Sequence, residues 1–328
     1  MARLNDLKLK CIELGIIEGI DVLPTRRRVN KENETYEDWQ FNDNCLKDSG
    51  RHLEFSVDDY VGAIQKYFLN KYEEEGTKSP FIETVLNMKS PGLALQIKHL
   101  KPEVQAEVRR DFSDYIYTEK IDGTRCLLCY DETYGWDFYS RNKSVTDELP
   151  ISYKTRLLIP NIDTSILKKY GIKSFIIDSE LVPQYDTINN MADGTEVVAD
   201  TQLSLVTSIL GSLDEASHKI QETNPLKFMT FDCIKLNDLW LDKYPLKKRL
   251  EVLDKLYSAL KLAGMGSYID KVPSTTYNKD KFYNDILLKG GEGVVAKDLN
   301  STYDMEAKRD RTLGKIKENI ISNYEFRK

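Results

Sequence analysis

The chain has 328 residues, of which 41% are hydrophobic and 30% are charged, and its formal net charge at pH 7 is −6. This length allows two domains, or one large and one small, and this composition allows a real hydrophobic core. No run reaches the roughly 18 apolar residues that a membrane helix needs, and the N-terminus lacks the apolar core of a signal peptide. An integral membrane protein is therefore excluded.

The cysteine and histidine patterns also exclude some chemistry. Five cysteines, an odd number spread along the chain, indicate reduced thiols and a cytoplasmic protein. Cys126 and Cys129 form the single C-x-x-C pattern, but residues three apart on a strand point to opposite faces. We therefore predict strand residues rather than a zinc or redox pair. The three histidines are too far apart in sequence to favour a histidine-based catalytic centre.

The negative net charge lowers the expectation of nucleic-acid binding without excluding it, because phosphate binding depends on local charge. Basic residues cluster at four places, each of which can also be a solvated face: Arg26–Arg28, Arg109–Arg110, Lys247–Arg249 and Lys308–Arg311.

Residues 1–82 are predicted to form a small, mainly helical region. Leu4, Leu7, Cys11 and Leu14 have helical spacing, and Gly15 is a plausible end. A second helix follows a capping box at residues 56–59, after a polar stretch at residues 30–51 that is predicted to be a loop. The first helix and the arginines after it faintly resemble a helix-extended-loop-helix DNA-binding motif, although a helical cap on the main domain is the favoured interpretation.

From residue 83 the pattern changes to strands. Strand-like runs are followed by one strong helical stripe that starts at Pro245 and ends near Gly264. Tyr134-Gly135 predicts a hairpin turn between the first two strands. The result is an α+β domain of antiparallel sheets with flanking helices. The predicted strands are residues 125–130, 136–140, 174–182, 227–235 and 293–297.

A series of short motifs runs through this second region. It begins with Lys120-Ile121-Asp122-Gly123-Thr124-Arg125, which reads K-x-D-G-x-R. On its own, this motif could be a charged strand edge before a turn. Downstream come five more blocks in order: Ser140-Arg141-Asn142, Asp178-Ser179-Glu180, Phe228-Met229-Thr230-Phe231-Asp232, Glu292-Gly293-Val294-Val295-Ala296-Lys297 and Lys315-Ile316-Lys317.

The ordered series resembles the covalent nucleotidyltransferases, which comprise ATP-dependent polynucleotide ligases and mRNA capping guanylyltransferases. A lysine nucleophile must be neutral to attack phosphorus, and with a pKa of about 10.4 only roughly one lysine in 2,500 is neutral at pH 7. Such a site needs burial, a metal ion or neighbouring cations. The candidate cations for one anionic pocket are Arg125, Arg141, Lys297, Lys315 and Lys317.

The resemblance implies a role for each matching residue. Lys120 would form the phosphoramidate with AMP, with Thr118 and Glu119 beside the nucleotide. Phe231 would stack on the base, and Glu180 would meet the ribose or a metal ion. Glu180 and Glu292 would supply carboxylates for Mg²⁺, with Mn²⁺ as an alternative. The residues implied to contact the sugar and phosphates are Arg125, Arg141, Lys297, Arg309, Lys315 and Lys317.

Several motif details favour ATP-dependent DNA ligases within this superfamily. Ser140 precedes Arg141, where capping enzymes tend to have Asp, and the segment Ser90–Ala94 resembles one that such ligases carry upstream of the nucleophile. RNA ligases that seal double-stranded breaks usually differ at positions 122 and 125. A GTP-dependent capping enzyme, an RNA ligase and a non-catalytic nucleic-acid-binding subunit remain the alternatives.

The domain boundaries follow from this resemblance. Residues 83–317 are expected to be the adenylation domain, with nicked double-stranded DNA as substrate. DNA ligases carry an oligonucleotide-binding (OB) barrel after the last lysine motif, and residues 318–328 are too few to form one. We expect a partner chain to supply the OB domain, with a fragment of a longer chain as the alternative. A split enzyme of this size would suit a virus or phage acting in the host cytoplasm.

Overall fold

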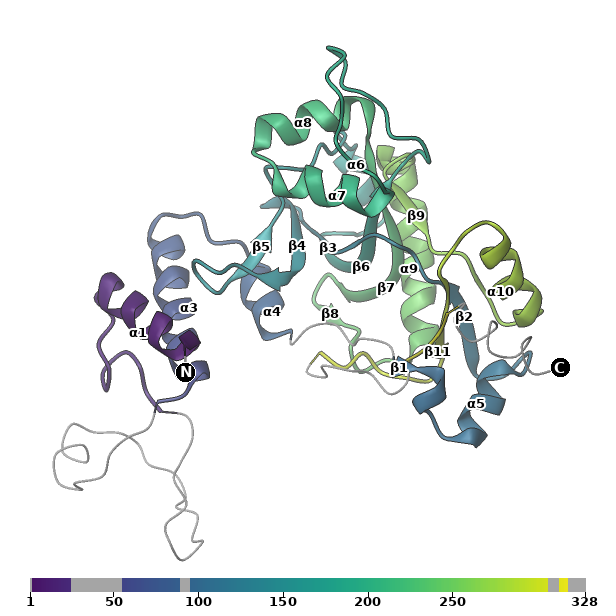
Figure 1. The fold of residues 1–328 in the computed structure, drawn as a ribbon, viewed down its shortest axis with the longest axis horizontal. Helices are drawn as coiled ribbons and strands as arrows, with labels where there is room; N and C mark the ends of the chain where they lie inside the picture. Colours follow the sequence, from purple (N-terminus) through teal and green to yellow (C-terminus); the bar gives the residue numbers. More distant parts are fainter. Residues whose placement is uncertain (1, 25–54, 89–94, 306–312, 318–328) are drawn as a thin grey trace, which may run out of the picture. The chain divides into compact units, whose positions relative to one another are not determined.

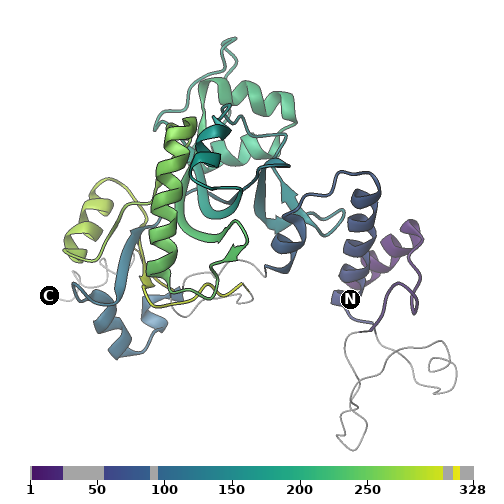
Figure 2. The ribbon, with the colours of Figure 1, turned by 180° about the vertical axis from the view of Figure 1, so that it is seen from behind.

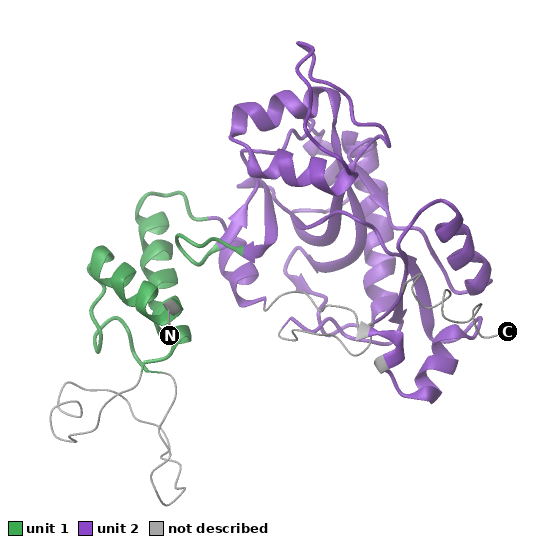
Figure 3. Cartoon of the chain, viewed as in Figure 1, with its two compact units in different colours: residues 1–78, 143–149 green, residues 79–142, 150–328 purple. Residues whose placement is uncertain are grey.

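A computed structural model describes residues 2–24, 55–88, 95–305 and 313–317 of the protein. The chain divides into two compact units, residues 1–78 with 143–149 and residues 79–142 with 150–328 (Figure 3). Several predicted features fall outside the described residues: Arg26–Arg28, the loop at 30–51, Ser90–Ala94, Lys308–Arg311 with Arg309, and the tail 318–328. No helix in the described part of the chain is long and apolar enough to cross a lipid bilayer.

The first unit contains the two helices that the sequence predicts. Helix α1 (Ala2–Leu14) ends before Gly15, whose φ of 73° suits glycine. Helix α3 (Val57–Glu74) begins with the expected capping box, in which Asp59 accepts from the backbone of Ser56 while Ser56 accepts from that of Asp59. One apolar cluster joins the helices, and its buried members are Leu7, Cys11, Ile16, Val22, Tyr60, Ala63 and Ile64.

A short segment from the middle of the chain belongs to this unit. The Gln65 side-chain amide donates a hydrogen bond of 2.7 Å to the carbonyl of Glu148, and the Lys10 amine donates one of 3.2 Å to that of Val145. The Tyr72 hydroxyl bonds to Asp147 at 3.3 Å. Residues 143–149 thus have their described hydrogen-bond partners in the helical unit, although the strand before them belongs mainly to the second unit.

The second unit contains two sheets, and most of their strand pairs are antiparallel (Figure 1). The seven-stranded sheet has the order β5-β4-β3-β6-β7-β8, with β9 beside β7 in parallel. Its strands are β3 (Thr124–Asp131), β4 (Gly135–Lys143), β5 (Pro150–Ser152), β6 (Ser174–Pro183), β7 (Leu226–Leu236), β8 (Leu239–Trp240) and β9 (Ile269–Lys271).

The five-stranded sheet has the order β1-β12-β11-β2-β10, and its β1–β12 pair is parallel. Its strands are β1 (Leu95–Gln96), β2 (Tyr115–Glu119), β10 (Ser274–Thr275), β11 (Gly293–Asp298) and β12 (Leu313–Lys317). The α+β class and the mainly antiparallel sheets with flanking helices are therefore confirmed. So is the hairpin at Tyr134-Gly135, where Gly135 has a φ of 86° between β3 and β4.

More helices interrupt the strands than the single one that the sequence predicted. The predicted one is α9 (Leu246–Leu260), which continues into a π turn, η2 (Lys261–Met265), and packs on β7 and β9 (Figure 2). The others are short, with only one to four buried residues each, so their periodicity is weak. They are α4 (Ile82–Asn87), η1 (Ile97–His99), α5 (Pro102–Arg109), α6 (Thr164–Lys169), α7 (Gln202–Gly211), α8 (Asp214–Thr223) and α10 (Lys279–Leu288).

Strand alternation sends the residues of β3 to two different cores. Cys126 and Leu128 enter the large cluster beneath α6 to α9, whereas Leu127 and Cys129 enter a smaller cluster with α4 on the opposite face. Cys126 and Cys129 are therefore buried free thiols on opposite faces, as predicted. Arg125 has the parity of Leu127 and Cys129, so it continues the face of the smaller cluster.

Candidate functional site

A cavity of about 410 Å³ opens in the second unit where the two sheets meet, a size typical of small-molecule sites. Its walls come from the end of β2, the starts of β3 and α9, the end of β4, the middle of β6 and β7, and β11 with the segment that follows it. It collects eight residues that the sequence predicted for one nucleotide site: Thr118, Glu119, Lys120, Arg125, Arg141, Glu180, Phe231 and Lys297.

Lys120 is positioned by the pairing of β2 with β11. Its backbone N–H donates a hydrogen bond of 2.8 Å to the carbonyl of Gly293, directly beyond the pair Glu119 and Val294. Its amine forms an ion pair with the carboxylate of Glu292. The Lys120 side chain is 25% exposed and that of Glu292 33% exposed, so both are accessible from solvent but held in place.

Close packing around Gly123 explains why the motif after Lys120 contains a glycine at this position. A Cβ atom at this position would lie 2.3 Å from the carbonyl oxygen of Leu181 and 2.8 Å from side-chain atoms of Glu180 and Val182. Real Cβ atoms do not make such contacts, so a side chain would push the turn away from β6. The glycine therefore allows the lysine-bearing turn to lie directly against the strand that carries Glu180.

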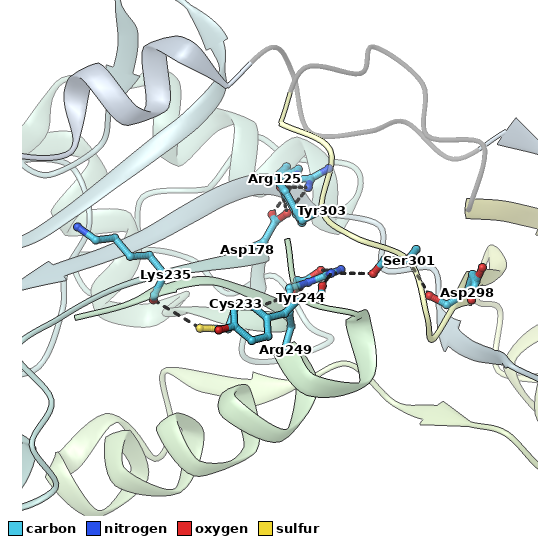
Figure 4. A network of polar contacts seen from close by, with 10 residues as sticks. Arg125, Asp178, Cys233, Lys235, Tyr244, Arg249, Asp298, Ser301 and Tyr303 are labelled. Atoms are coloured by element: carbon cyan, nitrogen blue, oxygen red, sulfur yellow. Dashed lines mark hydrogen bonds and ion pairs between the residues drawn. The ribbon is translucent and has the colours of Figure 1, made fainter. Parts of the chain in front are cut away.

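Arg125 is held by a buried carboxylate. Its Nε donates a hydrogen bond of 2.8 Å to Oδ1 of Asp178, and its Nη2 bonds to Oδ2 of the same residue (Figure 4). The hydroxyl of Tyr303 lies 3.3 Å from Nη2 and donates to Asp178 Oδ2 at 2.8 Å. Asp178 is fully buried, and this two-pronged geometry fixes the plane of the guanidinium group.

A second buried pair lies beside the first. Asp232 accepts hydrogen bonds of 2.8 and 3.0 Å from Nε and Nη2 of Arg249 at the start of α9. Nη1 of Arg249 bonds to the carbonyls of Tyr244 and Ser301 (Figure 4). Asp178 and Asp232 are direct neighbours across β6 and β7. Since like charges opposite one another destabilise a sheet, each aspartate needs its own arginine.

A β-bulge brings two consecutive residues of β7 to the cavity. Asp232 pairs with Asp178 and Thr230 pairs with Ser179, so the register skips Phe231. In a regular strand, neighbours point to opposite faces, but a bulge re-aims one of them. Phe231 and Asp232 consequently both line the cavity. Cationic atoms lie over the Phe231 ring: Lys297 Nζ is 4.3 Å and Arg125 Cζ is 5.3 Å from its centroid.

Burial shifts the pKa values of two side chains in the cavity wall toward 7. Burial raises the pKa of Glu180 from 4.5 to about 7, although Arg125 opposes this shift. Burial also lowers the pKa of Lys297 from 10.5 to about 8, against the attraction of Asp232 and Asp178. Perturbed groups that converge on one cavity are typical of functional sites.

The remaining predicted residues lie around this centre. Thr118 donates a hydrogen bond of 3.1 Å from its hydroxyl to the carbonyl of Val295, which ties β2 to β11. Burial raises the pKa of Glu119. Glu292 contacts Lys120 without lining the cavity, and Lys315 lies on β12 opposite Val295. The backbone of Lys317 ends β12, and Arg309 falls outside the described residues.

The structure adds one buried residue that the sequence did not indicate, Tyr303. It lies in an irregular segment between two motifs, without periodicity to mark it. The sequence showed Asp178, Asp232 and Arg249 inside or near motifs, but not that each aspartate binds an arginine from a distant element. Within the described residues, no cluster of three or more His, Cys, Asp or Glu side chains is arranged to hold a metal ion.

The motifs and this geometry agree with a family comparison. The family model described as "ATP dependent DNA ligase domain" matches residues 91–317. The chain belongs to this family. The ligase domain therefore includes both sheets and every residue that lines the cavity. The sequence matches no curated protein.

Solved structures of DNA ligases are similar to this ligase domain at low identity. A mycobacterial DNA ligase D in complex with ATP and MES is 15% identical with a TM-score of 0.42, over 70% of this chain and 59% of that chain. A Lig E DNA ligase is 19% identical with a TM-score of 0.42, over 70% and 68%. The ATP complex of the bacteriophage T7 ligase is 15% identical with a TM-score of 0.41, over 70% and 68%. The chain thus spans less than two thirds of the length of the first of these.

Proposed function

We propose that the protein is the adenylation subunit of an ATP-dependent DNA ligase and that Lys120 accepts AMP from ATP. The observation that carries this proposal is the position of Lys120 at the wall of a cavity lined by four further cationic residues, in a chain of the ATP-dependent DNA ligase domain family. The cavity and its charges suit a nucleoside triphosphate, which needs cations for its phosphates and a flat apolar face for its base.

In the first step, the Nζ atom of Lys120 attacks the α-phosphorus of ATP. A nitrogen–phosphorus bond forms, the bond from phosphorus to the bridging oxygen breaks, and pyrophosphate leaves. Protonated Nζ has no lone pair, so it must lose a proton before it attacks, and that proton faces Glu292 in the ion pair. Glu292 is the carboxylate beside that proton and is therefore the group that supports its removal.

The other cavity residues bind and orient the nucleotide. Arg125, Arg141 and Lys297 supply positive charge for the phosphates and for the charge that develops on the leaving pyrophosphate. Phe231 offers a ring face to the base. Nucleotide phosphates would favour the charged form of Lys297, whose pKa of about 8 leaves part of the population neutral at pH 8 in the free protein.

A divalent cation would complete this arrangement. Mg²⁺ usually keeps several waters and binds through one or two carboxylates plus substrate phosphates, so the two carboxylates of Glu180 and Glu292 fit it without a larger acidic cluster. These residues would hold Mg²⁺ or Mn²⁺, which would supply charge neutralisation on the phosphate oxygens.

We further propose that AMP passes from Lys120 to the 5′-phosphate of a nick in double-stranded DNA, and that the 3′-hydroxyl then displaces AMP. The OB domain that closes over the nucleotide would come from a partner chain. Adding a candidate barrel protein to a nick-sealing assay tests this point. Sealing that stays absent with every such protein would contradict the partner hypothesis.

The experiment that tests the proposal is covalent labelling of the protein with α-³²P nucleotides and Mg²⁺, followed by denaturing electrophoresis. We expect label from ATP in the wild type and none in Lys120→Ala, with Lys281→Ala, at an exposed lysine outside the cavity, as the matched variant that keeps the nucleophile. Label from GTP instead would support a capping guanylyltransferase. An absence of label even with a barrel protein present would support a non-catalytic binding subunit.

A further inference from the structure

The segment that follows β11 is fastened across the cavity wall by hydrogen bonds. The Ser301 carbonyl accepts a bond of 2.9 Å from Arg249 and one of 2.8 Å from the N–H of Leu246. The N–H of Tyr303 donates to the carbonyl of Asp242 at 2.7 Å. Thr302, Tyr303 and Asp304 consequently line the cavity, and Tyr303 is only 9% exposed.

Tyr303 lies between the two buried aspartate–arginine pairs. Its hydroxyl contacts both Asp178 and Arg125, at 2.8 and 3.3 Å, and Arg249 Cζ lies 5.7 Å from the centroid of its ring (Figure 4). One side chain from an irregular segment therefore joins β3, β6 and α9. From this position Tyr303 can fix where the two arginines lie relative to each other.

The chemistry of the hydroxyl matches its two neighbours. A phenol has one proton to donate and lone pairs to accept. The carboxylate of Asp178 can only accept, so the proton points to it, and the oxygen is left to accept from Nη2 of Arg125. Burial and the neighbouring Asp178 raise the pKa of Tyr303, which keeps the phenol protonated. A phenylalanine would keep the ring and lose both bonds.

We propose that Tyr303 is a positioning residue that holds Arg125 in the orientation in which it binds the nucleotide. This inference rests on the proposed function, because it assigns Arg125 to an ATP site. Asp178 and Tyr303 together hold the guanidinium group with its Cζ atom 5.3 Å from the ring centroid of Phe231. Without the phenol, Arg125 keeps its charge and its carboxylate but gains freedom to tilt.

The test compares Tyr303→Phe with Tyr139→Phe, in which another buried tyrosine hydroxyl loses its bond to a buried aspartate. Tyr139 donates to Asp137 at 2.7 Å and does not line the cavity. Calorimetric Kd for ATP, KM for ATP in Lys120 labelling, and Tm are measured for each. We expect Tyr303→Phe to raise both Kd and KM for ATP about tenfold and to leave the labelling rate at saturating ATP unchanged. Tyr139→Phe should leave both constants unchanged.

A double-mutant cycle shows whether Tyr303 acts through Arg125. In an Arg125→Lys background, Tyr303→Phe should change Kd no further, because the group that it positions is gone. Equal losses of ATP affinity in Tyr303→Phe and Tyr139→Phe, or full additivity with Arg125→Lys, would overturn the inference. A wild type that binds ATP but takes no label would defeat the proposed function while Kd still decides the role of Tyr303. A wild type that binds no ATP would overturn both.

Discussion

Glu180 and Lys297 show how burial can prepare single residues for a charged ligand. Lys297 is buried and Glu180 is largely buried in the cavity wall, and burial moves the carboxyl pKa up to about 7 and the amine pKa down to about 8. Near pH 7.5 each group is therefore close to its titration point. A bound phosphate would favour the charged amine and a bound cation the charged carboxylate, so the site can adapt its protonation to its ligand.

The raised pKa of Glu180 predicts a specific pH dependence of stability. Between pH 4.5 and 7 the folded protein holds a proton that the unfolded chain has lost, so the free energy of unfolding falls as pH rises through this range. Above pH 7 the contribution of this proton to the free energy of unfolding, up to about 3 kcal/mol, is fully lost. The substitution Glu180→Gln removes this titration. We therefore expect the difference in free energy of unfolding between Glu180→Gln and wild type, measured in urea, to shift in favour of the variant between pH 5 and pH 8.

The control for this experiment is Glu196→Gln, at an exposed carboxylate of the same unit. Its unfolding curves should follow those of the wild type at both pH values. If the free energies of unfolding of wild type and Glu180→Gln changed in parallel from pH 5 to 8, Glu180 would titrate near its ordinary value in the free protein, in contradiction to its burial.

At the scale of elements, the sequence predicted the strands better than their register. Alternation and turn residues placed β3, β4, β6, β7 and β11, and the resemblance carried eight side chains to one cavity. It could not predict the bulge in β7, because a bulge depends on how β7 pairs with β6. Nor could it predict that Asp232 meets Arg249 or that Asp178 meets Arg125 and Tyr303, since these partners lie on different elements.

The Asp232–Arg249 pair predicts how strongly α9 is tied to β7. Both side chains are buried, so Arg249→Met would leave a buried carboxylate facing Asp178. Removing one partner of a buried pair costs about 3–5 kcal/mol. We expect that loss in urea unfolding, and we expect Asp232→Asn together with Arg249→Met to recover most of it.

Lys248→Met is the matched control, because the neighbouring Lys248 forms an exposed pair with Glu251. Its cost should stay below about 1 kcal/mol. If Arg249→Met costs no more than Lys248→Met, water or a rearranged side chain compensates Asp232, and α9 is held mainly by its apolar contacts.

At the scale of the whole molecule, each of the two units has its own apolar cluster. The N-terminal unit has the cluster around Tyr60 and Ile64, and the ligase domain has separate clusters on both faces of its larger sheet. All residues that line the cavity belong to the second unit. The predicted boundary after residue 82 remains a prediction, as does the role of the helical unit.

This division predicts the behaviour of a shortened protein that starts at Ser79. Because a unit with its own core can fold alone, we expect the fragment to be folded by circular dichroism and to take ATP label at Lys120 within about twofold of the full-length rate. Calorimetry should show two transitions for the full chain and one for the fragment. Lys120→Ala in both lengths is the control. A folded fragment that takes no label would mean that the helical unit contributes to the adenylation step.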